Sequence, residues 1–166
     1  MPLKSDHFSE DIRDFMLCLD RTGVRYVLLG GEAVIYYGHA RLTGDTDFFY
    51  DIAEDNAQNL FRALRLFWRD NIPGVKAPSD LQVRGQVIQF GRPPNRIDLV
   101  NAVSGISFQE AWSSRREESL CWEGGNCRVF IIGLEPLMRN KQAAGRGRDL
   151  DDLRYLRKLS TNRPRH

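Results

Sequence analysis

A pair of glycines followed by a pair of aspartates constrains this sequence more than any other feature. Gly30 and Gly31 end a short apolar run that begins at Val24. An apolar run of this length between glycines is typical of a buried strand, and the residues after the glycines predict a short helix. Asp45 and Asp47 then open a second apolar stretch. Side chains two positions apart point to one face of a strand, so both carboxylates are expected on the same face.

The length and composition predict one soluble globular domain. Of the 166 residues, 42% are hydrophobic and 28% are charged, which is ordinary for a globular protein. We expect a single domain over 1–166, with a core over about 5–132 and C-terminal helices over about 134–159. No apolar run approaches the roughly 20 residues of a membrane span, and the polar start is unlike a secretory signal. These features favour a cytoplasmic protein that has no membrane partner.

Hydrophobic periodicity predicts an α/β (α+β) fold. Helices are predicted over 5–21 with Ser5 as the cap, and over 32–37, 53–69, 107–112, 134–144 and 148–159. Strands are predicted over 24–29, 46–52, 86–90, 96–100 and 126–132. We expect a short mixed sheet with the carboxylates on one face and helices packed on the other. The two C-terminal helices would cover one edge, and an unstructured tail would begin at Thr161.

A third carboxylate stands in another predicted strand. Asp98 is the one charge in an otherwise apolar strand centre, Ile97 to Val100, where a charge needs a partner or a function. If this strand pairs beside the one that begins at Asp45, Asp98 completes a cluster of three carboxylates. The alternative is an exposed strand face that carries both Arg96 and Asp98.

These residue types suit phosphate and metal chemistry. Gly30 and Gly31 let a ligand approach the backbone, and the start of a helix offers amides to an anion. Clustered carboxylates are costly unless a cation neutralises them, and Mg²⁺ or Mn²⁺ is the expected cofactor. Two metal ions held by Asp45, Asp47 and Asp98 would stabilise an in-line phosphoryl displacement, with Asp98 as the general base. The alternative is a simple tight turn, followed by acidic residues that only add solubility.

The motif resembles that of the DNA polymerase β-like nucleotidyltransferase superfamily. In that family an apolar residue and Gly-Gly or Gly-Ser precede an Asp-x-Asp strand, and a third carboxylate follows on a later strand. Leu29-Gly30-Gly31, Asp45-Thr46-Asp47 and Asp98 match these parts. The resemblance implies a nucleotidyltransferase fold and a magnesium-dependent transfer of a nucleoside monophosphate from a nucleoside triphosphate.

The C-terminal segment is similar to the closing helices of small bacterial members of that superfamily. These include the nucleotidyltransferase toxins of abortive-infection toxin and antitoxin systems. Lys141, Arg146, Asp149 and Asp152 match a lysine and an Arg-x-x-Asp-x-x-Asp-like run. The resemblance implies that Lys141 contacts nucleotide phosphates and that Asp149 or Asp152 orients it or closes the pocket. Alternatively, these carboxylates only begin a helix, where negative charge is favourable.

The resemblance also assigns nucleotide-binding roles to the loop between the glycines and the aspartates. Arg41 is expected to reach a triphosphate, and Thr43 is expected to fix the loop. An ordinary loop role is the alternative for both. Gly31 departs from members that carry a serine there, so only backbone amides are available, and the acceptor hydroxyl stays open among RNA, protein and a small molecule.

Two other functions compete with nucleotidyl transfer. A non-catalytic nucleotide- or RNA-binding module is favoured by the basic last third of the chain, although the same charges can line a solvated helix face. A toxin that an antitoxin partner holds inactive is the other. The basic residues are Arg139, Lys141, Arg146, Arg148, Arg154, Arg157, Lys158, Arg163 and Arg165.

Overall fold

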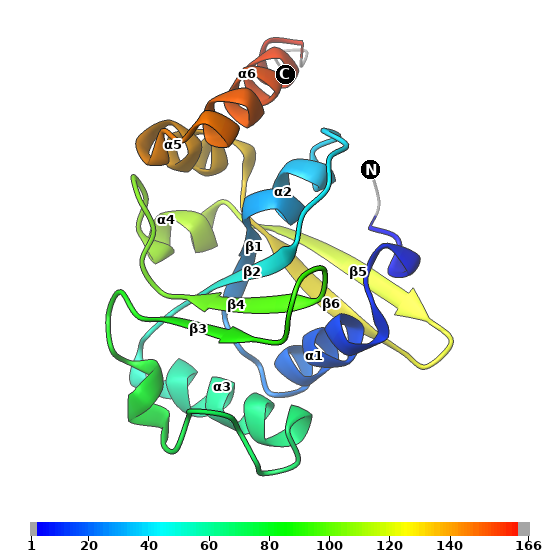
Figure 1. The fold of residues 1–166 in the computed structure, drawn as a ribbon, viewed down its shortest axis with the longest axis vertical. Coiled ribbons are helices and arrows are strands. Elements are labelled where there is room, and N and C mark those ends of the chain that lie inside the picture. Colours follow the sequence, from blue (N-terminus) through cyan, green and yellow to red (C-terminus); the bar gives the residue numbers. More distant parts are fainter. Residues whose placement is uncertain (1–2, 163–166) are drawn as a thin grey trace.

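The computed structural model describes residues 3–162 and shows a six-stranded mixed sheet flanked by helices (Figure 1). Strand β2 runs parallel to β4, and β1 runs parallel to β6, whereas the other neighbours are antiparallel. The chain therefore has a mixed α/β fold, as predicted. Across the sheet the strands are β3 (Val87–Phe90), β4 (Arg96–Val100), β2 (Asp45–Tyr50), β1 (Tyr26–Leu29), β6 (Gly125–Ile131) and β5 (Arg116–Trp122).

Residues 3–162 also form six α-helices and two short 3₁₀ turns, which precede, connect or follow these strands. Within residues 3–162, no helix is long and apolar enough to cross a membrane. The tail predicted from Thr161 starts inside the last helix, and its part from residue 163 lies outside the described residues. The helices are α1 (Glu10–Arg21), α2 (Gly30–Tyr36), α3 (Glu54–Phe67), α4 (Phe108–Ser113), α5 (Leu134–Ala144) and α6 (Gly147–Thr161); the turns are Ser5–His7 and Pro78–Leu81.

The first helix starts later than the sequence predicts. The prediction that Ser5 caps it is wrong, because Ser5–His7 forms a separate 3₁₀ turn. Ser9 is the cap, and its hydroxyl accepts a hydrogen bond from the Ile12 amide at 3.3 Å. Acidic residues in the first turn, Glu10 among them, add favourable charge at this end of the helix.

Strand β5 is absent from the prediction because its sequence lacks an apolar pattern. It is an edge strand in which Leu120 alone is buried, and charged residues fill much of the rest. Its pairing with β6 comes from a hairpin that turns at Glu123 and Gly124. Charge on an edge strand discourages pairing with other chains. Because of the same charged residues, apolar periodicity does not predict this strand.

Aromatic side chains alternate across β2 and anchor helices on both faces of the sheet. Phe48 contacts Phe15 of α1 at a ring-centroid distance of 5.1 Å, whereas Phe49 contacts Phe108 of α4 at 5.4 Å. Alternation places Phe49 on the same face as Asp45 and Asp47. The expectation that helices pack only opposite the carboxylates is therefore wrong. Helix α4 covers that face beside Phe49, and the carboxylate end of the strand stays uncovered by it.

The C-terminal helices form the predicted pair and stand beside α2 at one end of the molecule (Figure 1). Gly145 joins them in a left-handed conformation, with φ of 65°, which glycine adopts at little cost. The Asn140 amide donates a hydrogen bond to the Ser104 carbonyl at 2.8 Å and ties α5 to the loop before α4. Buried Leu137 and Leu156 attach the pair to the main core.

Candidate functional site

Parallel pairing of β2 with β4 brings the three predicted carboxylates together. Asp47 lies opposite Asp98 in the strand register, and Asp45 lies opposite Arg96. Each of Asp45, Asp47 and Asp98 offers a carboxylate oxygen, and these oxygens all lie within 4.8 Å of one another. Asp98 is only 6% exposed, so the alternative in which it lies on a solvated strand face is wrong.

The cluster disfavours three simultaneous negative charges. Burial, the negative charges of Asp45 and Asp98 and a hydrogen bond to Asp98 together raise the pKa of Asp47 to about 7. A neighbouring cation favours the ionised form of such a carboxylate. The electrostatics of the cluster therefore suit a bound cation.

Arg96 supplies a positive charge at this cluster, a role that the sequence analysis missed. Its Nη2 donates to Asp45 Oδ2 at 2.7 Å and to Asp98 Oδ2 at 3.2 Å, and its Nε donates to Asp98 Oδ1 at 2.9 Å. These contacts, first those with Asp98, raise the pKa of Arg96 above its usual value. The spacing in the sequence could have indicated this role. Arg96 precedes Asp98 by two residues, as Asp45 precedes Asp47, so Arg96 and Asp98 lie on one face of their strand.

Gly30 and Gly31 are the first two residues of α2, and each makes room for a different neighbour. Gly30 has a φ of 64°, and a Cβ atom there would overlap Asp47 Oδ2. A Cβ atom on Gly31 would lie 2.6 Å from Thr43 Oγ1. Thr43 in turn donates to the Asp45 carbonyl at 3.2 Å or its carboxylate at 3.3 Å. The glycines thus let the carboxylate strand and the preceding loop pack closely on the helix start.

Asp152 is the centre of a buried ion-pair network at the two C-terminal helices. Both of its oxygens accept hydrogen bonds from Arg41, from Nε and Nη2, each at 3.0 Å. Lys141 Nζ lies 2.9 Å from Asp152 Oδ2, and His39 Nε2 lies 3.8 Å from Oδ1. Asp152 is 1% exposed and Lys141 is 4% exposed. This network joins the 40–44 loop to α5 and α6, which are distant in sequence.

Asp149 extends the network toward the surface. Its carboxylate accepts from Lys141 Nζ at 3.2 Å and from Arg146 Nε at 2.8 Å. Burial opposes ionisation of Asp149, but the hydrogen bonds from Arg146 and Lys141 outweigh burial and hold its pKa below the usual value. The Lys141 ammonium is therefore held by two carboxylates, Asp149 and Asp152.

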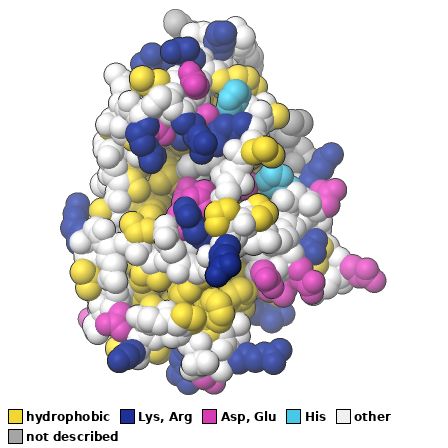
Figure 2. Space-filling view, in the orientation of Figure 1, with side chains coloured by type: hydrophobic (Ala, Val, Ile, Leu, Met, Phe, Trp, Pro, Cys, Tyr) yellow, Lys and Arg dark blue, Asp and Glu magenta, His cyan; other side chains and the backbone are white. Residues whose placement is uncertain are grey.

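A cavity of about 300 Å³ lies where these groups meet. It contains all six residues predicted to bind nucleotide and two of the three predicted metal ligands, whereas Asp98 does not line it. Arg146 and Arg148 are additions to the predicted binding set. Figure 2 shows an acidic patch in the middle of this face with basic side chains beside it. The cavity is lined by Gly30, Gly31, Arg41, Thr43, Asp45, Asp47, Lys141, Arg146, Arg148 and Asp149.

One acidic residue of the glycine helix, Glu32, is also buried near the site. Glu32 is 8% exposed and lies 2.6 Å from His7 Nε2, measured from its Oε2 atom. Burial raises the pKa of Glu32, and the His7 contact opposes that rise. No local sequence pattern predicts this pair, because 25 residues separate its members. Among the described residues, the one candidate metal cluster is that of the three aspartates.

The chain was compared with protein-family models and with curated proteins. No family model matches the chain, and no curated protein matches it. The functional argument therefore stands on the residues that line the cavity.

We expect Asp152→Ala to lower the free energy of unfolding by about 3 kcal/mol, because it leaves Arg41 and Lys141 without a buried counter-charge. Urea unfolding followed by circular dichroism measures this loss. Asp151→Ala is the matched control on the adjacent, exposed position, where its ion pair with Arg154 is 3.5 Å long. The control change should be below about 0.5 kcal/mol. Equal losses for both variants would contradict the assigned role of Asp152.

We expect Asp47→Asn to remove a pH dependence of stability from the metal-free protein. The folded pKa near 7 exceeds the usual value of 3.8. The folded state therefore binds more protons than the unfolded state between these values, and stability falls as pH rises through that window. At pH 8 the variant should have a Tm higher than the wild type by roughly 8 °C, and at pH 4 the two should agree. Thermal unfolding in EDTA measures this, with exposed Asp14→Asn as the control that should leave the wild-type curve unchanged.

Proposed function

We propose that this chain is a magnesium-dependent nucleotidyltransferase with the fold of the DNA polymerase β-like superfamily. It would transfer a nucleoside monophosphate from a nucleoside triphosphate to an acceptor hydroxyl. The observation that carries the proposal is the cavity itself, which has Asp45 and Asp47 on one wall and Lys141 and Arg146 on another. A triphosphate with a divalent cation presents both kinds of charge to such a cavity.

The acidic cluster fits a divalent cation. Asp45, Asp47 and Asp98 would hold it through carboxylate oxygens, which are the ligands that Mg²⁺ and Mn²⁺ prefer. The raised pKa of Asp47 and the guanidinium of Arg96 at the cluster both indicate a site that favours positive charge. When bound, the cation would stabilise charge on the phosphoryl oxygens during an in-line displacement.

The basic residues of the cavity suit the phosphates. Arg146 and Arg148 reach the cavity from the start of α6 and are exposed, so their guanidinium groups can adjust to a ligand. Lys141 is held in place by its two carboxylates and supplies a fixed charge. Fixed and adjustable donors together would orient the triphosphate against the carboxylate wall.

Asp98 is the proposed general base. It stands next to Asp47 at the cluster but does not line the cavity, so the acceptor hydroxyl would approach from the β4 side. Arg96 donates to both Asp98 oxygens, and an ionised carboxylate can take the proton of an incoming hydroxyl. RNA, a protein and a small hydroxyl compound remain acceptor candidates, and an antitoxin partner and a cytoplasmic location belong to the same proposal.

A second candidate function is a nucleotide-binding or RNA-binding module without turnover. The position of Arg96 favours it, because a guanidinium that satisfies Asp45 and Asp98 competes with the cation that catalysis needs. The two functions differ in whether a bound triphosphate releases pyrophosphate.

The proposed transfer is tested with α-labelled nucleoside triphosphates, magnesium and mixed acceptors, together with calorimetric titration of each triphosphate. We expect magnesium-dependent binding and label transfer in the wild type. Asp45→Asn/Asp47→Asn should reduce transfer at least about 1,000-fold, whereas exposed Asp14→Asn should leave it unchanged. Magnesium-dependent binding without pyrophosphate release would favour the binding module, and no binding of any triphosphate would contradict both functions.

Arg96 provides a test that does not need turnover. We expect Arg96→Gln to lower the dissociation constant for Mn²⁺ at least tenfold, because it removes a cation that already neutralises Asp45 and Asp98. Electron paramagnetic resonance of free Mn²⁺ measures the constant without nucleotide. Exposed Arg92→Gln is the control. Weaker Mn²⁺ binding in Arg96→Gln would instead mean that Arg96 holds the carboxylates in position.

A further inference from the structure

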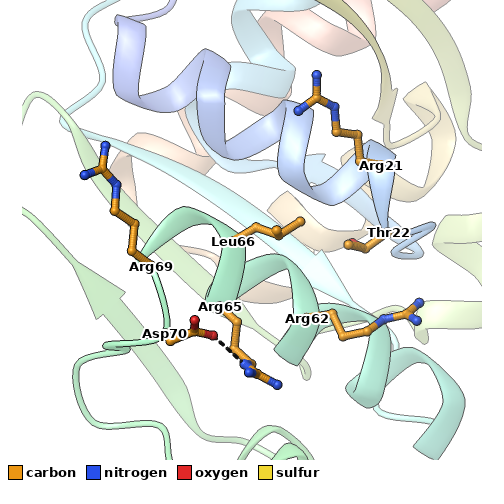
Figure 3. A pocket seen from close by; sticks show the side chains of 7 residues that line it. All are labelled: Arg21, Thr22, Arg62, Arg65, Leu66, Arg69 and Asp70. Atoms are coloured by element: carbon orange, nitrogen blue, oxygen red, sulfur yellow. Dashed lines mark hydrogen bonds and ion pairs between the residues drawn. The ribbon is translucent and has the colours of Figure 1, made fainter.

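A second hollow of about 540 Å³ lies between α1 and α3, away from the carboxylate cluster (Figure 3). Its floor includes Leu66, which is 56% exposed although it is a large apolar side chain. No aromatic side chain lines it. The lining residues are Arg21, Thr22, Arg62, Arg65, Leu66, Arg69 and Asp70.

The residues that line this hollow carry mainly positive charge. Four of its seven lining residues are arginines and one is an aspartate. Arg65 pairs with Asp70 at 2.7 Å. Arg21, Arg62 and Arg69 form no ion pair within residues 3–162. Like charges gathered around an exposed leucine repel one another, so an anionic partner would relieve this arrangement.

Three of the arginines form a row along α3 and just past its end. Arg62 and Arg65 are three residues apart and share one face of the helix, whereas Arg69 lies two residues beyond the last helical residue, Phe67. A helix rises 1.5 Å per residue, so Arg62 and Arg65 are attached about 4.5 Å apart along its axis. Arg21 stands across the hollow at the end of α1. Figure 3 shows the guanidinium groups spread around Leu66 rather than converging on one point.

Two residues at the edge of the hollow have a left-handed backbone conformation, which residues other than glycine seldom adopt. Arg69 and Asp70 have φ values of 49° and 66°, which non-glycine residues seldom adopt in succession. The Asp70 amide donates to the Arg65 carbonyl at 2.8 Å, and the Arg65–Asp70 ion pair closes the same turn. These contacts keep Arg69 at the rim instead of continuing the helix.

We propose that this hollow binds the phosphate backbone of single-stranded RNA. A row of separate cations suits a row of separate phosphates better than it suits one anion, and the guanidinium fork matches phosphate oxygens. Aspartate and glutamate are depleted at protein interfaces, which argues against an acidic protein as the occupant. Without aromatic lining there is no platform for base stacking. Binding is therefore independent of sequence, depends on salt, and requires neither nucleotide nor turnover.

The test is fluorescence anisotropy of a labelled 20-nucleotide RNA of mixed sequence, titrated with the full chain in EDTA at several salt concentrations. Arg62→Gln/Arg69→Gln should weaken binding at least tenfold and flatten the slope of log affinity against log salt by about 1.4. Arg21→Gln, on the other helix, should weaken binding by a smaller factor. Arg84→Gln/Arg92→Gln is the matched control, because it removes two exposed arginines from the loops on either side of β3, and it should change the affinity less than twofold.

Three results would overturn the proposal. The first is no RNA binding by the wild type at low salt, and the second is an equal loss in the Arg62→Gln/Arg69→Gln and Arg84→Gln/Arg92→Gln variants. The third is displacement of the RNA by poly-glutamate at equal charge concentration, which would identify an acidic protein as the occupant. Thermal unfolding of each variant verifies the fold. Because the assay omits magnesium and triphosphate, its result is separate from the success or failure of the proposed transfer reaction.

Discussion

The parallel pairing of β2 with β4 is the constraint on which the candidate site depends. Phe48 and Leu99 lie opposite each other in this pairing and are both buried. Because side chains alternate, burying those two on one face forces Asp47 and Asp98 onto the other. A register slip of one residue would set Asp47 beside an apolar side chain and disperse the cluster. The hydrophobic core thus determines the geometry of the carboxylates.

Two charge systems of opposite character face each other across the cavity. On the sheet, Asp45 and Asp98 share the guanidinium of Arg96 beside Asp47, and on the helical pair Lys141 and Arg146 share Asp149. The two systems interact electrostatically. The positive charge of Lys141 opposes the rise in the pKa of Asp47, and the negative charge of Asp47 contributes to the raised pKa of Arg146. Each system alone would carry excess charge. Their placement around one cavity reduces that cost and leaves a polarised space between them.

Local patterns predicted much of this arrangement, and pairings over long distances were the part they missed. The glycine pair, the Asp-x-Asp spacing and the isolated charge of Asp98 are visible in the sequence, because each breaks an apolar run. The contact of Arg41 with Asp152 joins residues 111 positions apart, and no periodicity encodes such a distance. Arg96 was missed for a related reason. Strand alternation placed it on the face of Asp98, but only the neighbouring strand shows that this face is buried beside Asp45.

The Lys141 ammonium group has one N–H donor that its two buried ion pairs do not use, and this donor is available to a ligand. An ammonium group has three N–H donors and no acceptor. Asp149 and Asp152 account for two of them, at 3.2 and 2.9 Å, while Lys141 also lines the cavity. The two carboxylates therefore fix the direction of the third donor, which can meet an anion without a further loss of side-chain entropy. Arg41 has fewer donors available for a ligand, because Nε and Nη2 donate to Asp152 and Nη1 donates to the Leu42 carbonyl. The buried acids accordingly position Lys141, and the exposed arginines of α6 supply the adaptable part of the same surface.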